Sequence, residues 1–404
     1  MSQMKVLIYE PYAFNTNGNL TLISLLFRML DRQKYELVVA TPFESPLVRA
    51  IRSDGGRCVV LEPPPSLRRY GGTIFEGGWL RRLTVALDLA RQTRSMVSFI
   101  RREKPDIIQC HSIRSLLMIG PAARLTKTPT FWYVKSELEN AWLDRVGLAL
   151  ANRVEFLCDS LAEGKYPHLR RYFKQKIGLL ALGVDLDEIE RVENSDTVEL
   201  ERDLSLNRGD LNIAFLGRVS PMKGIDYLLG AMKRVQRKVK RAKLYVVGEA
   251  DLEKNISFER AMRERVSSDE DLRGRVVFLG WRQDALSILS LMDFFVLPSL
   301  TEGFPRSIVE AMALGKAVIG TRVGGVPEAI LENQTGLIVE PRDEKGLADA
   351  MILLAGDKAL RTKLGEAGRR RASDLYSFKR FVFELEKVYR AMVPDQADYV
   401  GSRS

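Results

Sequence analysis

The sequence predicts an α/β protein built from two doubly wound parallel sheets, each in a domain of its own. Short apolar runs alternate with amphipathic stretches in both halves of the chain, which is the pattern of parallel strands joined by helical crossovers. A charged and poorly periodic segment at 186–210 separates the two halves. The length of 404 residues exceeds one ordinary hydrophobic core and suits two domains of roughly 150–200 residues each.

The first domain is predicted to cover residues 1–185. It opens with an apolar run, a polar loop, an amphipathic stretch and a second apolar run, which is the order strand, loop, helix, strand. Further along, apolar side chains recur at helical spacing and predict a long helix with one apolar face. The predicted elements are strand 5–9, helix 20–30, strand 35–40, helix 80–102, a strand within 105–111 and strand 130–134.

The second domain is predicted at 211–376, after a linker at 186–210. Helical patterns lie between most of its strands, as in the first domain. A final helix and polar tail at 377–404 are expected to pack back on the first domain. The predicted strands of the second domain are 212–216, 243–247, 276–279, 294–297, 317–319 and 336–339.

Composition and cysteine usage are those of an ordinary soluble protein. Hydrophobic residues make up 46% of the chain and charged residues 28%. Cys58, Cys110 and Cys158 are an odd number of cysteines without paired metal-ligand spacing, which predicts buried thiols in a reducing compartment. There is no run of about 20 apolar residues, and the first residues lead into a strand rather than a signal-peptide pattern. A cytoplasmic location is therefore expected.

The net charge of +10 is concentrated in the first half of the chain. Residues 1–180 hold 27 Lys and Arg against 16 Asp and Glu, whereas the remainder holds 35 against 36. Within 68–104, nine basic and three acidic residues are interleaved with aromatic and aliphatic ones. This pattern suits peripheral docking on an anionic membrane surface, which would place the protein on the inner face of the membrane. The alternative is an ordinary helix packed on its sheet after a solvated loop.

The first candidate site segment is 217–224, which follows a predicted strand. Gly217 and Gly224 permit tight backbone geometry, and Arg218 and Lys223 supply two cations of the kind that a diphosphate needs. Surface cations beside a turn are the competing explanation. The segment is not a Walker-type phosphate loop, because the required spacing and the hydroxyl residue after the lysine are missing.

The second candidate site segment, 298–305, joins a predicted strand to a predicted helix. Pro305 suits the first helical turn, whose free N–H groups and dipole form an anion site. Glu302 and Glu310, with seven residues between them, are placed to accept hydrogen bonds from a sugar and from a ribose. For either glutamate taken alone, a surface carboxylate is the alternative.

Together these motifs resemble the donor half of the family 4 retaining glycosyltransferases (glycosyl transferases group 1), which have the two-domain GT-B fold. The resemblance covers residues 211–341, and its motifs occur in the order expected for the family. It implies two Rossmann-like doubly wound domains facing an interdomain cleft. The matching segments are Phe215-Leu216-Gly217-Arg218, Lys223-Gly224, Val246-Val247-Gly248, Val277-Phe278-Leu279-Gly280, Pro298-Ser299, Glu302 with Glu310, Gly324-Gly325-Val326-Pro327-Glu328 and Gly336-Leu337-Ile338-Val339.

The resemblance implies metal-independent transfer of a sugar, with retained anomeric configuration, from a nucleoside diphosphate sugar to a glycan or lipid-linked acceptor in cell-envelope biosynthesis. It implies no cofactor, and a UDP or GDP sugar is expected as co-substrate. The resemblance implies three catalytic residues: Arg218 and Lys223 would neutralise the departing diphosphate, and Glu302 would lie near the donor sugar. The other donor-binding residues implied are Glu310 at the ribose, Trp281 and Arg282 at the base, and Gly18, Gly217, Gly248, Gly303, Phe304 and Pro305.

The first half of the chain departs from the family pattern. Only Gly18 corresponds to the glycine-rich loop that relatives place near the phosphates. Relatives often carry a histidine after the strand that ends at Tyr133 and Val134, where this sequence has Lys135. His111 follows a different strand and is a candidate for the acceptor side; a purely structural histidine is the alternative.

Two other classes of function are alternatives to the enzyme. A GT-B protein without turnover, acting as a nucleotide-sugar or glycan binding module, would explain the missing histidine. A nucleic-acid binder would explain the isoelectric point of about 9.4, but the sequence has no zinc-finger spacing or RNA-binding motif. Retention of both glutamates and both cations favours the enzyme.

Overall fold

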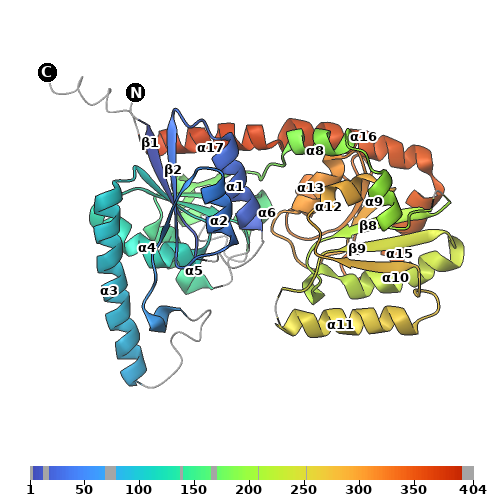
Figure 1. The fold of residues 1–404 in the computed structure, drawn as a ribbon, viewed down its shortest axis with the longest axis horizontal. Helices are drawn as coiled ribbons and strands as arrows, with labels where there is room; N and C mark the ends of the chain where they lie inside the picture. The colour runs from blue at the N-terminus through green and yellow to red at the C-terminus, as the bar shows by residue number, and fades with distance from the viewer. Residues whose placement is uncertain are drawn as a thin grey trace. The chain divides into compact units, whose positions relative to one another are not determined.

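A computed structural model describes residues 3–11, 18–68, 79–136, 140–164, 171–207, 209–251 and 253–393 of the chain. The chain divides into two compact units (Figure 1). Unit 1 comprises the chain up to Leu180 together with the segment from Val382 onward, and unit 2 runs from Ala181 to Phe381. Each unit contains one parallel sheet with helices between its strands, as predicted.

The sheet of unit 1 has seven strands in the order β3-β2-β1-β4-β5-β6-β7, and all its pairings are parallel. The strand order reverses between β1 and β4, as in doubly wound folds. Both β4 and β5 are buried at every position, because helices cover both faces of such a sheet. The strands are β1 Met4–Tyr9, β2 Tyr35–Thr41, β3 Arg57–Val60, β4 Ile107–Cys110, β5 Thr130–Val134, β6 Arg153–Phe156 and β7 Ile177–Leu179.

Polar caps start several helices of unit 1. Before the fourth helix, the hydroxyl of Ser112 accepts the N–H of Ser115, and the Ser115 hydroxyl accepts the N–H of Ser112, so two otherwise unpaired N–H groups are satisfied. The long third helix packs against the fourth. The helices are α1 Gly18–Met29, α2 Pro46–Ser53, α3 Trp79–Glu103, α4 Ile113–Thr126, α5 Ala141–Leu150 and α6 Asp159–Glu163, with short 3-10 turns η1 Pro65–Leu67 and η3 Lys174–Lys176.

The sheet of unit 2 has six strands in the order β10-β9-β8-β11-β12-β13, again with parallel pairings. Its order reverses between β8 and β11. The strands predicted for this domain are all present, with ends within two residues of the predicted ones. They are β8 Leu211–Leu216, β9 Ala242–Val247, β10 Val276–Gly280, β11 Phe294–Leu297, β12 Ala317–Thr321 and β13 Leu337–Val339.

The most extensive helix packing in unit 2 is that of α10 against α15 and of α13 against α16. Glu344 at the start of α15 lies over Gly230 of α10, where an added Cβ would approach its carboxylate oxygen to 2.3 Å. The helices are α8 Leu186–Glu193, α9 Val198–Asp203, α10 Ile225–Lys238, α11 Glu253–Ser268, α12 Ala285–Ser290, α13 Arg306–Ala313, α14 Val326–Ala329, α15 Glu344–Gly356 and α16 Lys358–Leu375, with the 3-10 turn η4 Pro221–Lys223.

The prediction of a linker at 186–210 is wrong for most of that segment, which forms α8 and α9 and belongs to unit 2. Asp185 caps α8 by accepting the N–H groups of Asp187 and Glu188, and Ile189 is buried. Ile189 is the one buried side chain of α8. Because most other residues of this helix are charged, the sequence shows no clear apolar periodicity there. The first domain also ends at Leu180 rather than 185.

The final helix, α17 Phe378–Met392, contributes residues to both units. Its part from Val382 onward belongs to unit 1. There the ring of Tyr389 lies 5.8 Å from that of Tyr35, centroid to centroid. The tail from 394 lies outside the described residues.

The state of the cysteines and the apolar character of the helices can be compared with what the sequence predicts. All three cysteines are free; Cys110 and Cys158 are buried and Cys58 is half-buried. Burial raises the pKa of the Cys58 thiol to about 11, so this thiol is protonated at neutral pH. Among the helices that the structure describes, none is both long and apolar enough to cross a membrane.

Candidate functional site

In unit 2, the two candidate segments follow the neighbouring strands β8 and β11, between which the strand order reverses. Ligands of doubly wound sheets bind outside the carboxyl ends of the strands at such a reversal. The segments 217–224 and 298–305 therefore lie where the fold favours a ligand.

Backbone contacts join the ends of three strands at this edge of the sheet. Gly248, after β9, has φ of +127°, and an added Cβ would lie 2.0 Å from the carbonyl oxygen of Gly217. Its N–H donates to the carbonyl of Gly280 at 2.7 Å. Only glycine fits such a backbone angle and such a close approach, so Gly217 and Gly248 shape this edge of the sheet.

The loops after β8 and β11 are held together by their backbones. The N–H of Leu300 donates to the carbonyl of Met222 at 2.8 Å. Gly224 has φ of +66°, and a Cβ there would lie 2.0 Å from the carbonyl oxygen of Pro298. As a result, Lys223 is held beside the loop that carries Glu302.

Lys223 and Glu302 form an ion pair through Oε1 of the glutamate. The hydroxyl of Ser299 donates to the same oxygen at 2.7 Å. The side chain of Glu302 is only 9% exposed and that of Lys223 19%, so the pair is partly shielded from water and stronger than a surface ion pair. The structure thus brings two of the three predicted catalytic residues into contact.

The third predicted catalytic residue, Arg218, has a different partner. Its guanidinium lies 2.6 Å from a carboxylate oxygen of Asp251, in the loop after β9, and Asn255 donates to the other oxygen. Burial of Asp251 opposes its ionisation, but the hydrogen bonds from Arg218 and Asn255 outweigh that effect and keep the pKa of Asp251 below its usual range. Arg218 is therefore a cation in a stable pair, with a side chain that is 60% exposed.

Glu310 lies on α13 and is paired with Arg306, one turn earlier. The Nε of Arg306 donates to Oε1 of Glu310 at 2.7 Å. Pro305 precedes the helix as its N-cap rather than lying in the first turn. The N–H groups of Arg306, Ile308 and Val309 already donate to backbone carbonyls, so the start of this helix offers an anion fewer donors than the sequence predicts.

The other predicted donor-binding residues have distinct environments. Trp281 is 53% exposed beside Gly280. Arg282 is paired with Asp284 at 2.8 Å and Asp203 at 3.0 Å, and these hydrogen bonds raise the pKa of its guanidinium. Phe304 is buried, with its ring 5.2 Å from that of Tyr376, which makes it a packing residue in this structure.

A third loop, after β12, supports the loop of Glu302. The N–H of Gly325 donates to the carbonyl of Gly303 at 2.9 Å. Gly324 has φ of +48°, and an added Cβ would lie 1.8 Å from the carbonyl oxygen of Glu302. Thr321 donates its hydroxyl to the carbonyl of Ser299. The Gly-Gly motif seen in the sequence therefore has a structural role at the site.

Sequence reasoning assigned no role to Ser299, Arg306 or Asp251. The spacing of Arg306 and Glu310, four residues apart on a predicted helix, is the one signal that could have revealed a partner. Ser299 was part of a recognised motif, but its hydroxyl contact depends on how the loop turns.

In unit 1, His111 lies in a buried polar cluster at the ends of β1 and β4. The hydroxyl of Tyr389 donates to Oε1 of Gln109, which leaves the amide nitrogen of Gln109 to donate to Nε2 of His111. The proton of the imidazole is then on Nδ1, which lies 3.8 Å from a carboxylate oxygen of Glu10. The His111 side chain is 0% exposed, which favours a structural role over an acceptor contact.

The imidazole of His111 is held neutral. Burial, with a smaller effect from Lys135, lowers its pKa well below 6.5. Burial also lowers the pKa of Lys135 to about 8, against the opposing effect of Glu10. Gly18, the remaining predicted residue of unit 1, is the first residue of α1; the loop before it, 12–17, lies outside the described residues.

His111 is expected to make the protein less stable in acid. Because its pKa is lower in the folded state than in the unfolded state, unfolded chains bind a proton as the pH falls below 6.5 and folded chains do not. Stability should therefore fall by up to about 1.4 kcal/mol per pH unit in that range from this group. Urea unfolding at pH 7.5 and 5.5 should show a smaller loss for His111→Gln than for the unmodified protein. Equal losses in both proteins would contradict the neutral imidazole.

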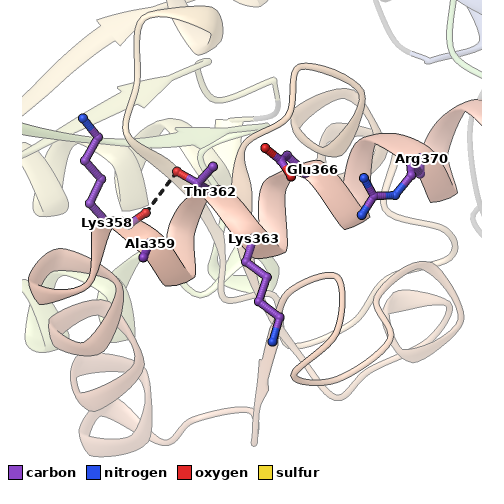
Figure 2. Close-up of a pocket in the computed structure, with 6 residues that line it drawn as sticks. All are labelled: Lys358, Ala359, Thr362, Lys363, Glu366 and Arg370. Carbon is purple, nitrogen blue, oxygen red and sulfur yellow. Dashed lines mark hydrogen bonds between the residues drawn. The ribbon is translucent and has the colours of Figure 1, made fainter.

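A surface pocket also lies along α16 (Figure 2). None of the predicted site residues lines it. Its charged side chains come from a single helix, and Thr362 is used in a hydrogen bond to the carbonyl of Lys358. It is therefore not the candidate site. The lining residues are Lys358, Ala359, Thr362, Lys363, Glu366 and Arg370. Across the described part of the chain, no group of three or more His, Cys, Asp or Glu is arranged to hold a metal ion.

Two doubly wound parallel sheets in separate units define the class of fold, GT-B, which the chain shares with solved glycosyltransferase structures. Residues 210–357 match the model of the family described as Glycosyl transferases group 1. The chain is a glycosyltransferase, and its second unit resembles this group.

Known relatives extend the likeness beyond that segment. An Escherichia coli enzyme, UDP-Gal:alpha-D-GlcNAc-diphosphoundecaprenol alpha-1,3-galactosyltransferase, is 25% identical over 76% of this chain and 81% of its own. The capsular polysaccharide biosynthesis glycosyltransferase CapM of Staphylococcus aureus is 24% identical over 83% and 90%. The structure of Anabaena Alr3699/HepE in complex with UDP and glucose shares the fold, with a TM-score of 0.77 at 17% identity over 96% of this chain and 99% of that one.

Proposed function

We propose that this glycosyltransferase moves a sugar, with retained anomeric configuration and without a metal ion, from a nucleoside diphosphate sugar to a glycan or lipid-linked acceptor. The observation that carries the proposal is the cluster of Lys223, Glu302 and Ser299, which lies where the strand order of the unit 2 sheet reverses. The helix α13, with its pair of Arg306 and Glu310, begins directly after the loop of Glu302. Carboxylates suit the hydroxyls of a sugar and a ribose, and a lysine suits a departing diphosphate.

Metal independence is proposed from the cations of the site. Lys223 is adjacent to Glu302, and Arg218 carries a largely exposed guanidinium in the same loop. Two such cations give a leaving diphosphate the charge compensation that a divalent ion supplies in other enzymes. Retention of configuration is proposed from the resemblance to family 4, and proton NMR of the product's anomeric centre would test it.

A UDP or GDP sugar is the proposed donor, and the UDP-containing complex of the Anabaena protein favours UDP. A thermal-shift screen of UDP, GDP and ADP in EDTA should show one nucleotide stabilising the protein. Glu310→Ala should weaken that nucleotide's binding by roughly 1–3 kcal/mol, because a hydrogen bond between a carboxylate and hydroxyls is lost. Calorimetry measures this loss directly. Unchanged affinity in Glu310→Ala, or stabilisation only when a divalent metal is added, would contradict the proposal.

The proposed acceptor is a glycan or a lipid-linked sugar, as the names of the E. coli and S. aureus relatives favour. A lipid-linked acceptor requires access to a membrane, and α3 provides a surface for it. Leu83 and Leu87 are 51% and 52% exposed although they are one helical turn apart. Arg94 is exposed on the same side, two turns on. We therefore propose peripheral docking of α3 on an anionic membrane surface at the cytoplasmic face.

Replacing both exposed leucines of α3 should weaken this docking. The double variant Leu83→Ser/Leu87→Ser is expected to sediment with anionic vesicles several-fold less than the unmodified protein, because about 2 kcal/mol or more of apolar contact is lost. Leu353→Ser is a matched control, since Leu353 is 49% exposed on α15 of unit 2. Equal sedimentation of the double variant and the control would show that α3 does not dock.

A further inference from the structure

Among the residues that the structure describes, each carboxylate of the site has one oxygen in a hydrogen bond or ion pair and one oxygen without a partner. Oε1 of Glu302 accepts from Ser299 and pairs with Lys223, and Oε1 of Glu310 accepts from Arg306. Within the described ranges, the Oε2 atom of neither glutamate has a hydrogen bond. A carboxylate held by one oxygen has a fixed orientation, while the other oxygen retains its full capacity to accept hydrogen bonds.

The hydroxyl of Ser299 is committed to this task. The residue is completely buried, and its single proton is donated to Glu302 at 2.7 Å. Its own carbonyl is fixed by the hydroxyl of Thr321. Because water does not reach Ser299, its loss would leave Oε1 of Glu302 with Lys223 alone, and the carboxylate would be free to rotate about that contact.

The pair of Arg306 and Glu310 is not explained by helix stability. Arg306 is the first residue of α13, whose first turn contains no acidic residue. A cation there faces the positive end of the helix dipole, and a basic residue four positions before an acidic one is the less favourable order. A residue placed against these preferences, with its Nε 2.7 Å from the buried Glu310, indicates a role at the site.

We propose that Ser299 and Arg306 are positioning residues that divide recognition of the donor between them. Ser299, with Lys223, directs Oε2 of Glu302 toward the transferred sugar, and Arg306 directs Oε2 of Glu310 toward the nucleoside. This inference rests on the proposed function, because it assumes a nucleoside diphosphate sugar at this site. It follows that the two residues affect different halves of the same ligand.

Calorimetry with two ligands separates these roles. UDP reports the nucleoside contact alone, and UDP-glucose reports both; GDP and GDP-mannose replace them if guanine is selected in the thermal-shift screen. Ser299→Ala should leave UDP affinity within about 2-fold and lower the ratio of UDP-glucose to UDP affinity roughly 5-fold. Arg306→Met should lower both affinities roughly 5-fold or more and leave their ratio unchanged.

Ser290→Ala is the matched control, since it removes one hydroxyl of unit 2 that donates to the carbonyl of Ser287 at 2.7 Å. This control variant should leave the affinities for both ligands unchanged. Loss of both affinities in Ser299→Ala, with the ratio preserved, would overturn the inference in favour of a structural serine. An unchanged ratio with unchanged affinities would overturn it as well. If Arg306→Met does not fold, Arg306→Lys, which retains the charge but not the planar group, should give the same pattern more weakly.

Nucleotide binding by the unmodified protein distinguishes failure of this inference from failure of the proposed function. No binding of any nucleotide would overturn the proposed function and this inference with it. Binding in the unmodified protein, together with the wrong pattern in the two variants, would overturn the inference alone.

Discussion

Glu302→Gln is expected to lower turnover by at least about 100-fold, the loss typical of removing one preorganised charged group from an active site. Glutamine has nearly the same size, so the loop should keep its backbone hydrogen bonds. Binding of the nucleoside diphosphate should not fall with turnover. Lys223 loses its partner, and its charge becomes available to the diphosphate, so UDP affinity should rise about 2- to 5-fold.

Steady-state kinetics and calorimetry of UDP test these two expectations together. Glu340→Gln is the matched control, because it neutralises a carboxylate paired with Arg322 on the surface of the same unit. That variant should retain normal turnover and normal UDP affinity. Turnover of Glu302→Gln within a few fold of normal would remove Glu302 from the catalytic residues. Weaker UDP binding would show that Lys223 does not reach the diphosphate.

Gly324→Ala is expected to lower turnover by a similar factor without contacting any ligand. The new Cβ would meet the carbonyl oxygen of Glu302 at 1.8 Å, at a φ of +48° that side chains rarely adopt. The loop of Glu302 has to move, and a displacement of about 1 Å at a reacting centre costs about 100-fold in rate. Stability should fall as well, by on the order of 1–3 kcal/mol, because of the strained backbone.

The informative comparison for this variant is Gly356→Ala. An added Cβ at Gly356, the last residue of α15, meets nothing within 4 Å, so neither rate nor stability should fall. Activity assays should be run well below the unfolding temperature of each variant, so that lost turnover is not lost folding. Near-normal turnover of Gly324→Ala would mean that the loop adapts and that its position is not critical.

The strands of unit 2 were predictable because parallel strands buried on both faces are continuous apolar runs. Three strands of unit 1, β3, β6 and β7, were not predicted. β3 and β6 have four residues each and contain charged side chains, Arg57, Arg153 and Glu155, and β7 has three residues including Gly178. Such segments form strands because a neighbouring strand offers hydrogen bonds, and that neighbour is far away in the sequence.

The same distinction holds for the site: its motifs can be recognised from neighbouring residues in the sequence, whereas its pairings join residues that are far apart in the sequence. The loops of Lys223 and Glu302 and the helix of Glu310 were found from local motifs. The pairing of Arg218 with Asp251 joins residues 33 positions apart on different loops, and no local pattern specifies it. Which cation meets which carboxylate is decided by the register of β8, β9 and β11, which becomes known only with the fold.

The division of α17 between the two units has a consequence for synthesis of the chain. Leu385 and Tyr389 are completely buried in unit 1, although its sheet is finished by residue 179. A ribosome has to translate the whole of unit 2 before it reaches these two side chains. The nascent N-terminal unit is therefore incomplete until then, because Gln109 lacks its hydrogen bond from Tyr389. A fragment ending at Leu180 should fold only when a peptide containing 382–393 is supplied in trans.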